Sequence, residues 1–318
     1  MLTFVSSMKT KLILFISIFS LKIGLCQSNV PDSYKNFSSP SKIKILSWNI
    51  YMLPGIAPIR GRATRAKAIG ETLKDSDYDV IVFQEAFHHK ARRKIEKLLE
   101  EKFPYQAGPA NRKLISMKTN SGIWIFSKHP IRSTRSIIYK NRLGIDAFSR
   151  KGALLVEIEI NHQRIQVAGT HLQNAGPYWI KQQQCVEFYH RLLKPELKED
   201  VPQIVCGDFN IKQKHEEEYR LMLQNLNAIN GELSGEIKNS YNRAENDLHV
   251  DKTSNDADLI DYILVRNTIG MEVTHRKISI FKKQWSPLHA DLSDHYAVEA
   301  QFNFDNAIVA STSIAEKK

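Results

Sequence analysis

The feature that most limits how this chain can fold is the alternation of short apolar segments with amphipathic ones along a single span. One segment alternates strictly, with Leu154, Val156 and Ile158 on one face and Glu157 and Glu159 on the other, the pattern of a half-buried strand. Because no Pro/Gly-rich break interrupts the span, we expect one α/β domain. The predicted strands cover residues 43–48, 79–83, 122–126, 153–160, 165–169, 203–206, 259–265 and 296–302.

Apolar residues at helical spacing predict three helices between these strands. The arginines and lysines of the first two, Arg65 and Arg92 among them, are expected to lie on solvated outer faces. The apolar positions are Ala66, Ile69 and Leu73, then Ala91, Ile95 and Leu98, and finally Trp179, Val186 and Leu193.

The first residues are typical of a secretory signal peptide. A short basic stretch precedes the apolar run 12–19, and Gly24 and Cys26 occupy the small-residue positions before a cleavage site at Gln27. An uncleaved anchor is the alternative, and a secreted or periplasmic protein is expected. The predicted division is a signal peptide at 1–26, a linker at 27–41, a catalytic domain at 42–304 and a flexible tail at 305–318.

Charge indicates the kind of binding partner, and the cysteine content indicates the state of the thiols. Lysine and arginine number 45 against 34 aspartates and glutamates, a net charge of +11, which favours nucleic acid or an acidic membrane face as partner. Beyond the predicted signal peptide only Cys185 and Cys206 remain, without zinc or redox spacing. We expect two buried, inert thiols, with a Cys185–Cys206 disulfide as the alternative.

Acids, amides and histidines cluster where the predicted strands end, the place where a scaffold displays catalytic groups. Oxygen ligands without cysteine suit a hard cation such as Mg²⁺, and a histidine beside an acid can activate water. The set therefore fits hydrolysis of a phosphate ester. Its members are Asn49, Glu85, His171, Asp208, Asn210, Asp261, Asp294 and His295.

In chain order the fragments WN, QE, GTH, GDFN, IDY and SDH resemble the endonuclease/exonuclease/phosphatase superfamily, from about residue 43 to residue 303. The resemblance implies an α/β fold of the DNase-like kind. This fold is a four-layer αββα sandwich of two mixed β-sheets flanked by helices. It also implies a divalent-metal phosphodiesterase or phosphatase site at one end of the sandwich.

The resemblance implies roles for individual residues. Glu85 would be the principal Mg²⁺ ligand, helped by Asn49, and Asp294 would support the metal or the nucleophile. His295 would be the general base, and Asp261 would orient its imidazole. One or two ions are expected, with Mn²⁺ or Co²⁺ as substitutes.

The remaining roles concern the phosphate. Asp208 and Asn210 would hold the water and the scissile phosphate, and His171 would donate to a phosphate oxygen. Two positions before the predicted orienting acid this chain has leucine where many relatives have arginine. Asp256 and Asp258 therefore stay open as alternatives for that role.

Three local segments resemble neutral sphingomyelinases. Two are WNIYMLP at 48–54 and SGIWIFSKHPI at 121–131. The third places Asp146 and Lys151 at the spacing of a pair that in those enzymes is proposed to switch, with the lysine freed to act in the site. An exposed loop pair of little energetic weight is the alternative.

A later segment resembles the hairpin of secreted bacterial sphingomyelinases, whose exposed aromatics enter the bilayer. Phe281 and Trp285 would do so here, beside a basic cluster attracted to headgroups. The alternative is an ordinary strand pair that buries Ile278 and Ile280.

The function implied is a Mg²⁺-dependent, phospholipase-C-type sphingomyelinase that hydrolyses sphingomyelin to ceramide and phosphocholine. It would act as a monomer peripheral to the membrane that holds its lipid substrate. Two alternatives stay open. One is a secreted metal-dependent nuclease of the same superfamily, for which the positive charge would serve nucleic-acid binding, and the other is a catalytically idle toxin subunit or adhesion module.

Overall fold

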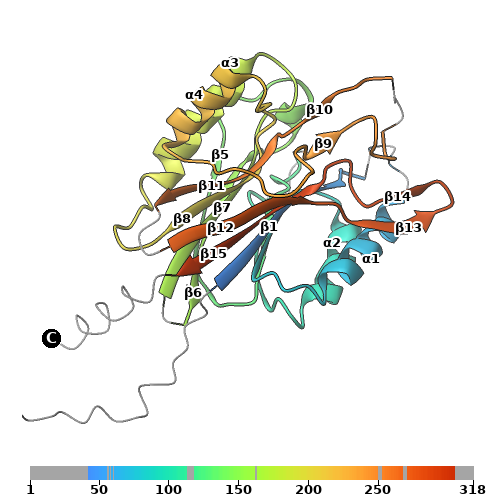
Figure 1. Ribbon diagram of the computed structural model, residues 1–318, viewed down its shortest axis with the longest axis horizontal. Coiled ribbons are helices and arrows are strands. Elements are labelled where there is room, and N and C mark those ends of the chain that lie inside the picture. The colour runs from blue at the N-terminus through green and yellow to red at the C-terminus, as the bar shows by residue number, and fades with distance from the viewer. Residues whose placement is uncertain are drawn as a thin grey trace, which may run out of the picture. The chain divides into compact units, whose positions relative to one another are not determined.

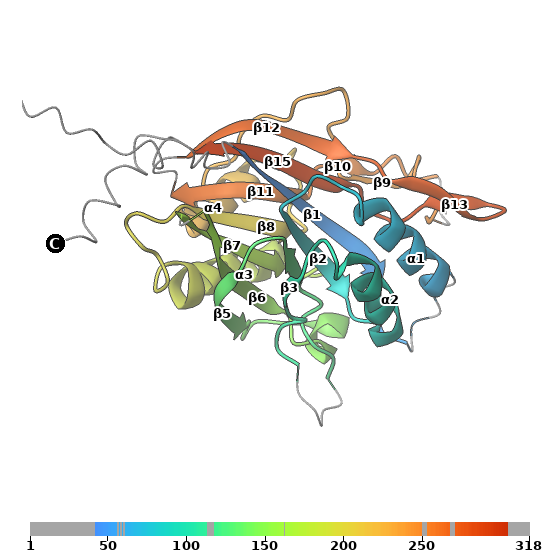
Figure 2. The ribbon, with the colours of Figure 1, turned by 90° about the horizontal axis from the view of Figure 1, so that it is seen from below.

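A computed structural model describes residues 42–304 except 56, 58, 60, 113–117, 162, 250–252 and 268–270. The predicted signal peptide, linker and tail lie outside the described residues. Within them, two sheets pack face to face and helices cover their outer faces (Figures 1 and 2). No helix in this part of the chain has the length and apolar character needed to cross a membrane.

The first sheet has six strands in the order β12-β15-β1-β2-β4-β3. β1 runs parallel to β2 and antiparallel to β15, so the sheet is mixed. Its strands are β1 (Lys42–Met52), β2 (Val80–Ala86), β3 (Tyr105–Ala107), β4 (Trp124–Ser127), β12 (Met271–Ser279) and β15 (Ala297–Phe304).

The second sheet has five strands in the order β11-β8-β7-β6-β5. It is also mixed, because β7 and β8 are parallel and the other neighbours antiparallel. Its strands are β5 (Ile131–Ile138), β6 (Gly152–Ile160), β7 (Gln163–His171), β8 (Gln203–Asp208) and β11 (Asp261–Asn267).

Helices α1 and α2 cover the first sheet, and α3 and α4 cover the second (Figure 2). Shorter elements lie around the end of the sandwich that carries the polar strand ends. The helices are α1 (Arg62–Leu73), α2 (His89–Leu99), η2 (Gly144–Phe148), α3 (Tyr178–Phe188) with its continuation η3 (Tyr189–Leu193), and α4 (Glu216–Leu226). The short strands are β9 (Tyr241–Asn242), β10 (Ala257–Asp258), β13 (Lys282–Ser286) and β14 (His289–Asp291).

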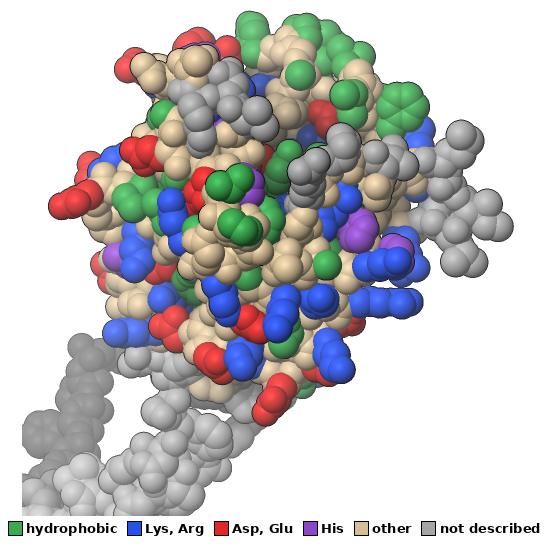
Figure 3. All heavy atoms as spheres, turned by 90° about the vertical axis from the view of Figure 1, so that its right-hand side faces the viewer, with side chains coloured by type: hydrophobic (Ala, Val, Ile, Leu, Met, Phe, Trp, Pro, Cys, Tyr) green, Lys and Arg blue, Asp and Glu red, His purple; other side chains and the backbone are tan. Residues whose placement is uncertain are grey.

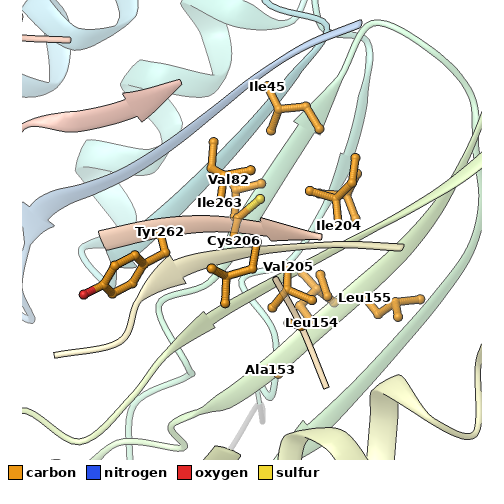
Figure 4. Close-up of a cluster of buried hydrophobic side chains, with 14 of the residues drawn as sticks. Ile45, Val82, Ala153, Leu154, Leu155, Ile204, Val205, Cys206, Tyr262 and Ile263 are labelled. Carbon is orange, nitrogen blue, oxygen red and sulfur yellow. The ribbon is translucent and has the colours of Figure 1, made fainter. Parts of the chain in front are cut away.

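Alternate side chains of β1 contribute to two different core layers, one on each face of the sheet. Ile43 and Ile45 face the second sheet, whereas Leu46 and Trp48 pack under α1 and α2. Successive side chains of a strand point to opposite faces, so a strand with apolar residues at nearly every position must be covered on both sides. Figure 4 shows the layer between the sheets, where side chains of β1 and β2 meet those of β6, β8 and β11.

Every predicted strand corresponds to an observed one, and the predicted fold class is confirmed. Strand β5, helix α4 and the short strands β3, β9, β10, β13 and β14 were not predicted. Strand β12 was not among the predicted strands either, although the alternative strand pair that buries Ile278 falls on it. β5 leaves most of its side chains partly or fully exposed, so it carries no apolar pattern from which a strand could be inferred.

Three expectations about helix faces are wrong. Arg65 and Arg92 are buried, not solvated. Trp179 lies on the exposed side of α3, at 51% exposure. The buried face of α3 is formed by Ile180, Cys185 and Phe188, among others. Cys185 and Cys206 are free thiols inside the core, and burial raises the pKa of each well above its ordinary value.

Candidate active site

The predicted site residues converge at one end of the sandwich because each lies at, or within a few residues of, the end of a strand that reaches this point. Asn49 lies near the end of β1 and Asp208 ends β8. The two sheets meet directly at this point, since the Asn49 amide nitrogen Nδ2 donates to Asp208 Oδ2 across 3.0 Å. His171 ends β7 beside Asp208, and the two are paired in the strand register.

The backbone is strained at this end. Tyr51 and Glu85 have φ values of 51° and 55°, and they are the described residues other than glycine and asparagine with positive φ. Side chains with a β-carbon avoid this region unless the surroundings impose it. Asn210, just after β8, has φ 53°. The ends of β1 and β2 and the residues just after β8 thus share irregular backbone at this end of the sandwich.

His295 and Asp261 form a buried pair. The Nδ1 atom of His295 lies 2.9 Å from Asp261 Oδ2, and its Nε2 atom lies 3.8 Å from Asp208 Oδ2. Burial opposes protonation of the imidazole, but Asp261 and Asp208 outweigh it and raise the pKa of His295 well above its ordinary value. The neighbouring acid Asp258 instead pairs with Lys214, so Asp261 is the carboxylate that contacts the histidine.

Asp208 contacts several other residues of the site. Its carboxylate accepts hydrogen bonds from the Asn49 amide and, at 2.9 Å, from the backbone N–H of Asn210, and His171 Nε2 lies 3.4 Å from it. Burial favours the neutral acid, but His171 and His295 outweigh it and hold the pKa of Asp208 below its usual range. The carboxylate is therefore ionised and fixed in orientation.

Lys151 is buried, with 2% of its surface exposed, and belongs to this site. Its ammonium lies 3.1 Å from Asp146 Oδ1 and 3.1 Å from His171 Nε2, and it donates to the carbonyl of Leu172 at 2.6 Å. Because an ammonium only donates, His171 Nε2 accepts here and its proton sits on Nδ1. That atom is buried without a hydrogen-bond partner in the described part of the chain.

Burial and the neighbouring Lys151 lower the pKa of His171 to about 4, so the imidazole is neutral. While Lys151 occupies Nε2, His171 cannot donate from that nitrogen. The structure thus brings the predicted residues Asp146, Lys151 and His171 into one chain of contacts that ends at Asp208.

The surroundings of Glu85 show whether the residues present could hold a metal ion. Its Oε2 atom is buried and has no hydrogen-bond partner among the residues described. Burial and repulsion by Asp294 raise the pKa of Glu85 to about 8. A buried carboxylate that repels its neighbour and leaves an oxygen unpaired is stabilised by a cation, and oxygen donors suit Mg²⁺. The Asn49 amide and the carboxylates of Asp294 and Asp208 belong to the same donor set.

A second group of metal-ligand type overlaps the site. Ligand atoms of Asp208, Asp261 and His295 lie within 4.8 Å of one another. His295 and Asp261 of this group bond to each other through Asp261 Oδ2, and the buried Asp261 Oδ1, like Glu85 Oε2, has no hydrogen-bond partner among the described residues. The donor chemistry of this end of the sandwich supports a divalent metal.

Arg65 is a buried residue beside the site that was not predicted from the sequence. Its guanidinium is fully buried and donates to the carbonyls of Leu292 at 2.9 Å, Tyr51 at 2.8 Å and Ile50 at 3.3 Å. It therefore joins α1 to the end of β1 and to the loop that carries His295. Arg65 lies one helical turn before Ile69, on the buried stripe, and this spacing was the available signal.

Phe281 and Trp285, predicted to enter a bilayer, make intramolecular contacts. Phe281 packs on Trp48 with ring centroids 5.1 Å apart. The Trp285 ring lies against α1, since a β-carbon at Gly61 would come within 2.1 Å of it. On the β13–β14 hairpin the strongly exposed apolar side chain is Leu288, at 82%.

Residues 46–295 match the Endonuclease/Exonuclease/phosphatase family, and the chain belongs to it. Among curated relatives, phospholipase C of Staphylococcus aureus is 25% identical over 287 residues, which cover 81% of this chain and 86% of the relative. Sphingomyelinase C 2 of Leptospira interrogans is 27% identical over 300 residues, covering 85% of this chain and 47% of the relative.

Solved structures agree with this assignment. A crystal structure of beta toxin from Staphylococcus aureus superposes with a TM-score of 0.74 at 26% identity, covering 81% of this chain and 99% of that one. A variant of the same toxin with bound magnesium ions gives a TM-score of 0.74 at 24% identity and covers 83% and 100%. The predicted superfamily and its layered fold are confirmed.

Proposed function

We propose that the protein is a Mg²⁺-dependent phosphodiesterase of the phospholipase C type that hydrolyses sphingomyelin to ceramide and phosphocholine. The observation that carries the chemistry is the buried His295–Asp261 pair opposite Asp208, next to the unpaired oxygen of Glu85. The relatives named phospholipase C and sphingomyelinase C, which match 81% and 85% of the chain, support the substrate class.

Glu85 would hold the metal, with Asn49 and Asp294 as further oxygen donors. Mg²⁺ bound there would neutralise negative charge on the phosphate oxygens. Positive charge at Glu85 also disfavours a second positive charge on His295. Metal bound at Glu85 would thus lower the pKa of His295 toward the neutral form, in which the imidazole can accept a proton.

His295 is the proposed general base. Its Nδ1 atom is held by Asp261, so Nε2 is the nitrogen that takes a proton from water. The water oxygen then forms a bond to phosphorus as the phosphorus–oxygen bond to ceramide breaks. The ceramide oxygen takes a proton from solvent as it leaves, His295 returns to solvent the proton it took from the attacking water, and phosphocholine remains.

Asp208, Asn49 and Asn210 orient the reacting groups. Because Asn49 and the Asn210 backbone each donate to Asp208, its carboxylate is preorganised beside the base. Lys151 supplies a buried positive charge that can offset charge developing on the phosphate. His171 assists from Nε2 when Lys151 does not occupy that nitrogen.

The proposal also includes where the protein acts and in what oligomeric state. The protein would be secreted and peripheral to a membrane, since the leader at 1–26 has the pattern of a signal peptide. It would act as a monomer on a lipid surface. The positive charge of +11 is the feature that favours the alternative, a nuclease.

The two functions are separated by one pair of assays on the mature protein in Mg²⁺. The first measures phosphocholine release from sphingomyelin vesicles, and the second measures nicking of supercoiled plasmid. We expect release with intact plasmid. Nicking without release would replace the lipase by a nuclease of the same family.

A further inference from the structure

We propose that an apolar platform beside the site is the surface that docks on the lipid bilayer. This inference rests on the proposed function and adds the surface through which the enzyme would reach its substrate. The platform is formed by η2 with the residue before it and by the start of α3, and its side chains are Leu143, Ile145, Phe148, Tyr178 and Trp179.

These side chains are far more exposed than is usual for large apolar groups. Ile145 is 89% exposed and Phe148 72%, and the other three are about half exposed. None of the residues of η2, all of them described, is buried. Figure 3 shows hydrophobic side chains gathered along the upper edge of the face, in the region where α3 lies in Figure 1. Contiguous exposed apolar surface of this kind marks an interaction site.

Hydrogen bonds join the two parts of the platform. The backbone N–H of Leu143 donates to Gln173 Oε1 at 3.2 Å, and the Gln173 amide returns a bond to the Leu143 carbonyl at 3.0 Å. The N–H of Asn174 donates to Asp146 Oδ2 at 2.8 Å. The segment after β7 is thus fastened to η2 a few residues before it enters α3 at Tyr178.

The platform borders the reacting groups. Asp146 lies within η2 between Ile145 and Phe148, and its carboxylate pairs with Lys151, which contacts His171. The scissile phosphate of a membrane phospholipid lies at the headgroup level. An active site that cleaves this phosphate must therefore lie next to a surface that contacts the bilayer. The platform lies next to the site, because the ion pair between Asp146 and Lys151 connects the two.

The chemistry of the platform fits a bilayer as its occupant. Leucine, isoleucine and phenylalanine are suited to the acyl boundary, and tyrosine and tryptophan to the headgroup level. The exposed Lys140, four residues before η2, adds a positive charge of the kind that anionic lipid phosphates attract. The hairpin aromatics, by contrast, are occupied by contacts with the core and α1.

The test compares matched serine variants. Ile145→Ser/Phe148→Ser alters η2, and Trp179→Ser alters α3 without touching η2. Ile229→Ser is the control, because Ile229 is 62% exposed and pairs with Val265 near the other end of the second sheet. Flotation with sphingomyelin/cholesterol vesicles in EDTA measures binding without turnover. Turnover is measured in Mg²⁺ on those vesicles and on a short-chain sphingomyelin dispersed as monomers.

We expect both platform variants to lose vesicle binding and vesicle turnover by about tenfold or more, with turnover of the monomeric substrate retained and the control unchanged. Unchanged vesicle binding would overturn the proposal. So would an equal loss on the monomeric substrate, or a wild-type dimer that the substitutions dissociate. If wild type binds vesicles through the platform but hydrolyses neither substrate, the proposed function fails and the docking surface stands.

Discussion

The imidazole of His295 is bound to the carboxylate of Asp261 through Nδ1, at 2.9 Å, and this leaves Nε2 directed toward Asp208, 3.8 Å away. The bond selects which nitrogen is free for chemistry. A side chain whose tautomer and orientation are fixed in this way can act as a general base with little reorganisation. Asp261 itself is fixed by its neighbours, since its backbone N–H donates to Ser240 Oγ at 3.1 Å.

Asp261→Asn should therefore lower kcat by about 10²- to 10⁴-fold, with a smaller effect on KM, because the amide no longer favours the required tautomer. Steady-state kinetics on a choline phospholipid provide the measurement. Asp258→Asn is the matched control, since Asp258 pairs with Lys214. If Asp258→Asn costs more activity than Asp261→Asn at equal folded fraction, the assignment of the orienting acid is wrong.

Glu85→Gln should abolish most of the response to metal. The substitution keeps the size of the side chain but removes the charge that makes its oxygen a strong ligand, so activity should fall by at least about a hundredfold. Mg²⁺ raises the Tm of a protein that binds it in the folded state. Scanning calorimetry with and without Mg²⁺ should show that this increase is lost in Glu85→Gln and kept in Glu217→Gln, an exposed control paired with Arg220. An unchanged increase in the first variant would place the metal elsewhere.

Arg65→Met should destabilise the protein by about 2–4 kcal/mol, because the buried carbonyls of Ile50 and Leu292 lose their donor. Urea unfolding measures this change. Arg93→Met, on the exposed side of α2, should change stability little. Arg65→Lys should recover part of the loss. Equal stability of the two methionine variants would show that the bonds of Arg65 contribute nothing net.

Glu299 should make the fold sensitive to acid. Burial opposes its ionisation, but the hydroxyls of Tyr78 and Ser279 donate to it and Lys44 and Lys277 lie nearby, so its pKa is lowered. A lowered pKa in the folded state adds stability above the ordinary glutamate pKa of about 4.3. That stability is lost as the pH falls through the folded value.

Glu299→Gln should therefore be less stable than wild type at pH 7, and the difference should shrink below about pH 4. Urea unfolding across this pH range is the measurement. Glu101→Gln, an exposed position, should follow wild type throughout. A difference for Glu299→Gln that does not vary with pH would mean that packing, and not charge, explains its effect.

Much of the fold could be predicted because most of its strands pack against another layer on one or both faces, and each case leaves its own apolar pattern in the sequence. β1 and β6 carry patterns dictated by the layers above and below them, so their places in the sequence are readable. β5 could not be inferred, because it is an edge strand with mostly exposed side chains. Pairing with β6 forms it, and pairing between distant segments leaves no local pattern.

The site could be predicted where its residues lie at strand ends, as Asn49, Glu85 and Asp208 do. Arg65 was misread because charge was taken as a sign of exposure, although its partners are backbone carbonyls that leave no mark in the sequence. Trp179 was misread in the opposite sense, since an aromatic residue at helical spacing was assigned to the core. Only the fold shows that Ile180, Cys185 and Phe188 lie on the buried face of α3 and that Trp179 does not.

The most direct test of the central claim is phosphocholine release from sphingomyelin vesicles, measured for wild type and His295→Ala in Mg²⁺ and in EDTA. The account predicts release by wild type in Mg²⁺, none in EDTA, and a loss of at least about 10²-fold in His295→Ala at an unchanged folded fraction. Release that persists in EDTA, or that His295→Ala retains, would contradict it.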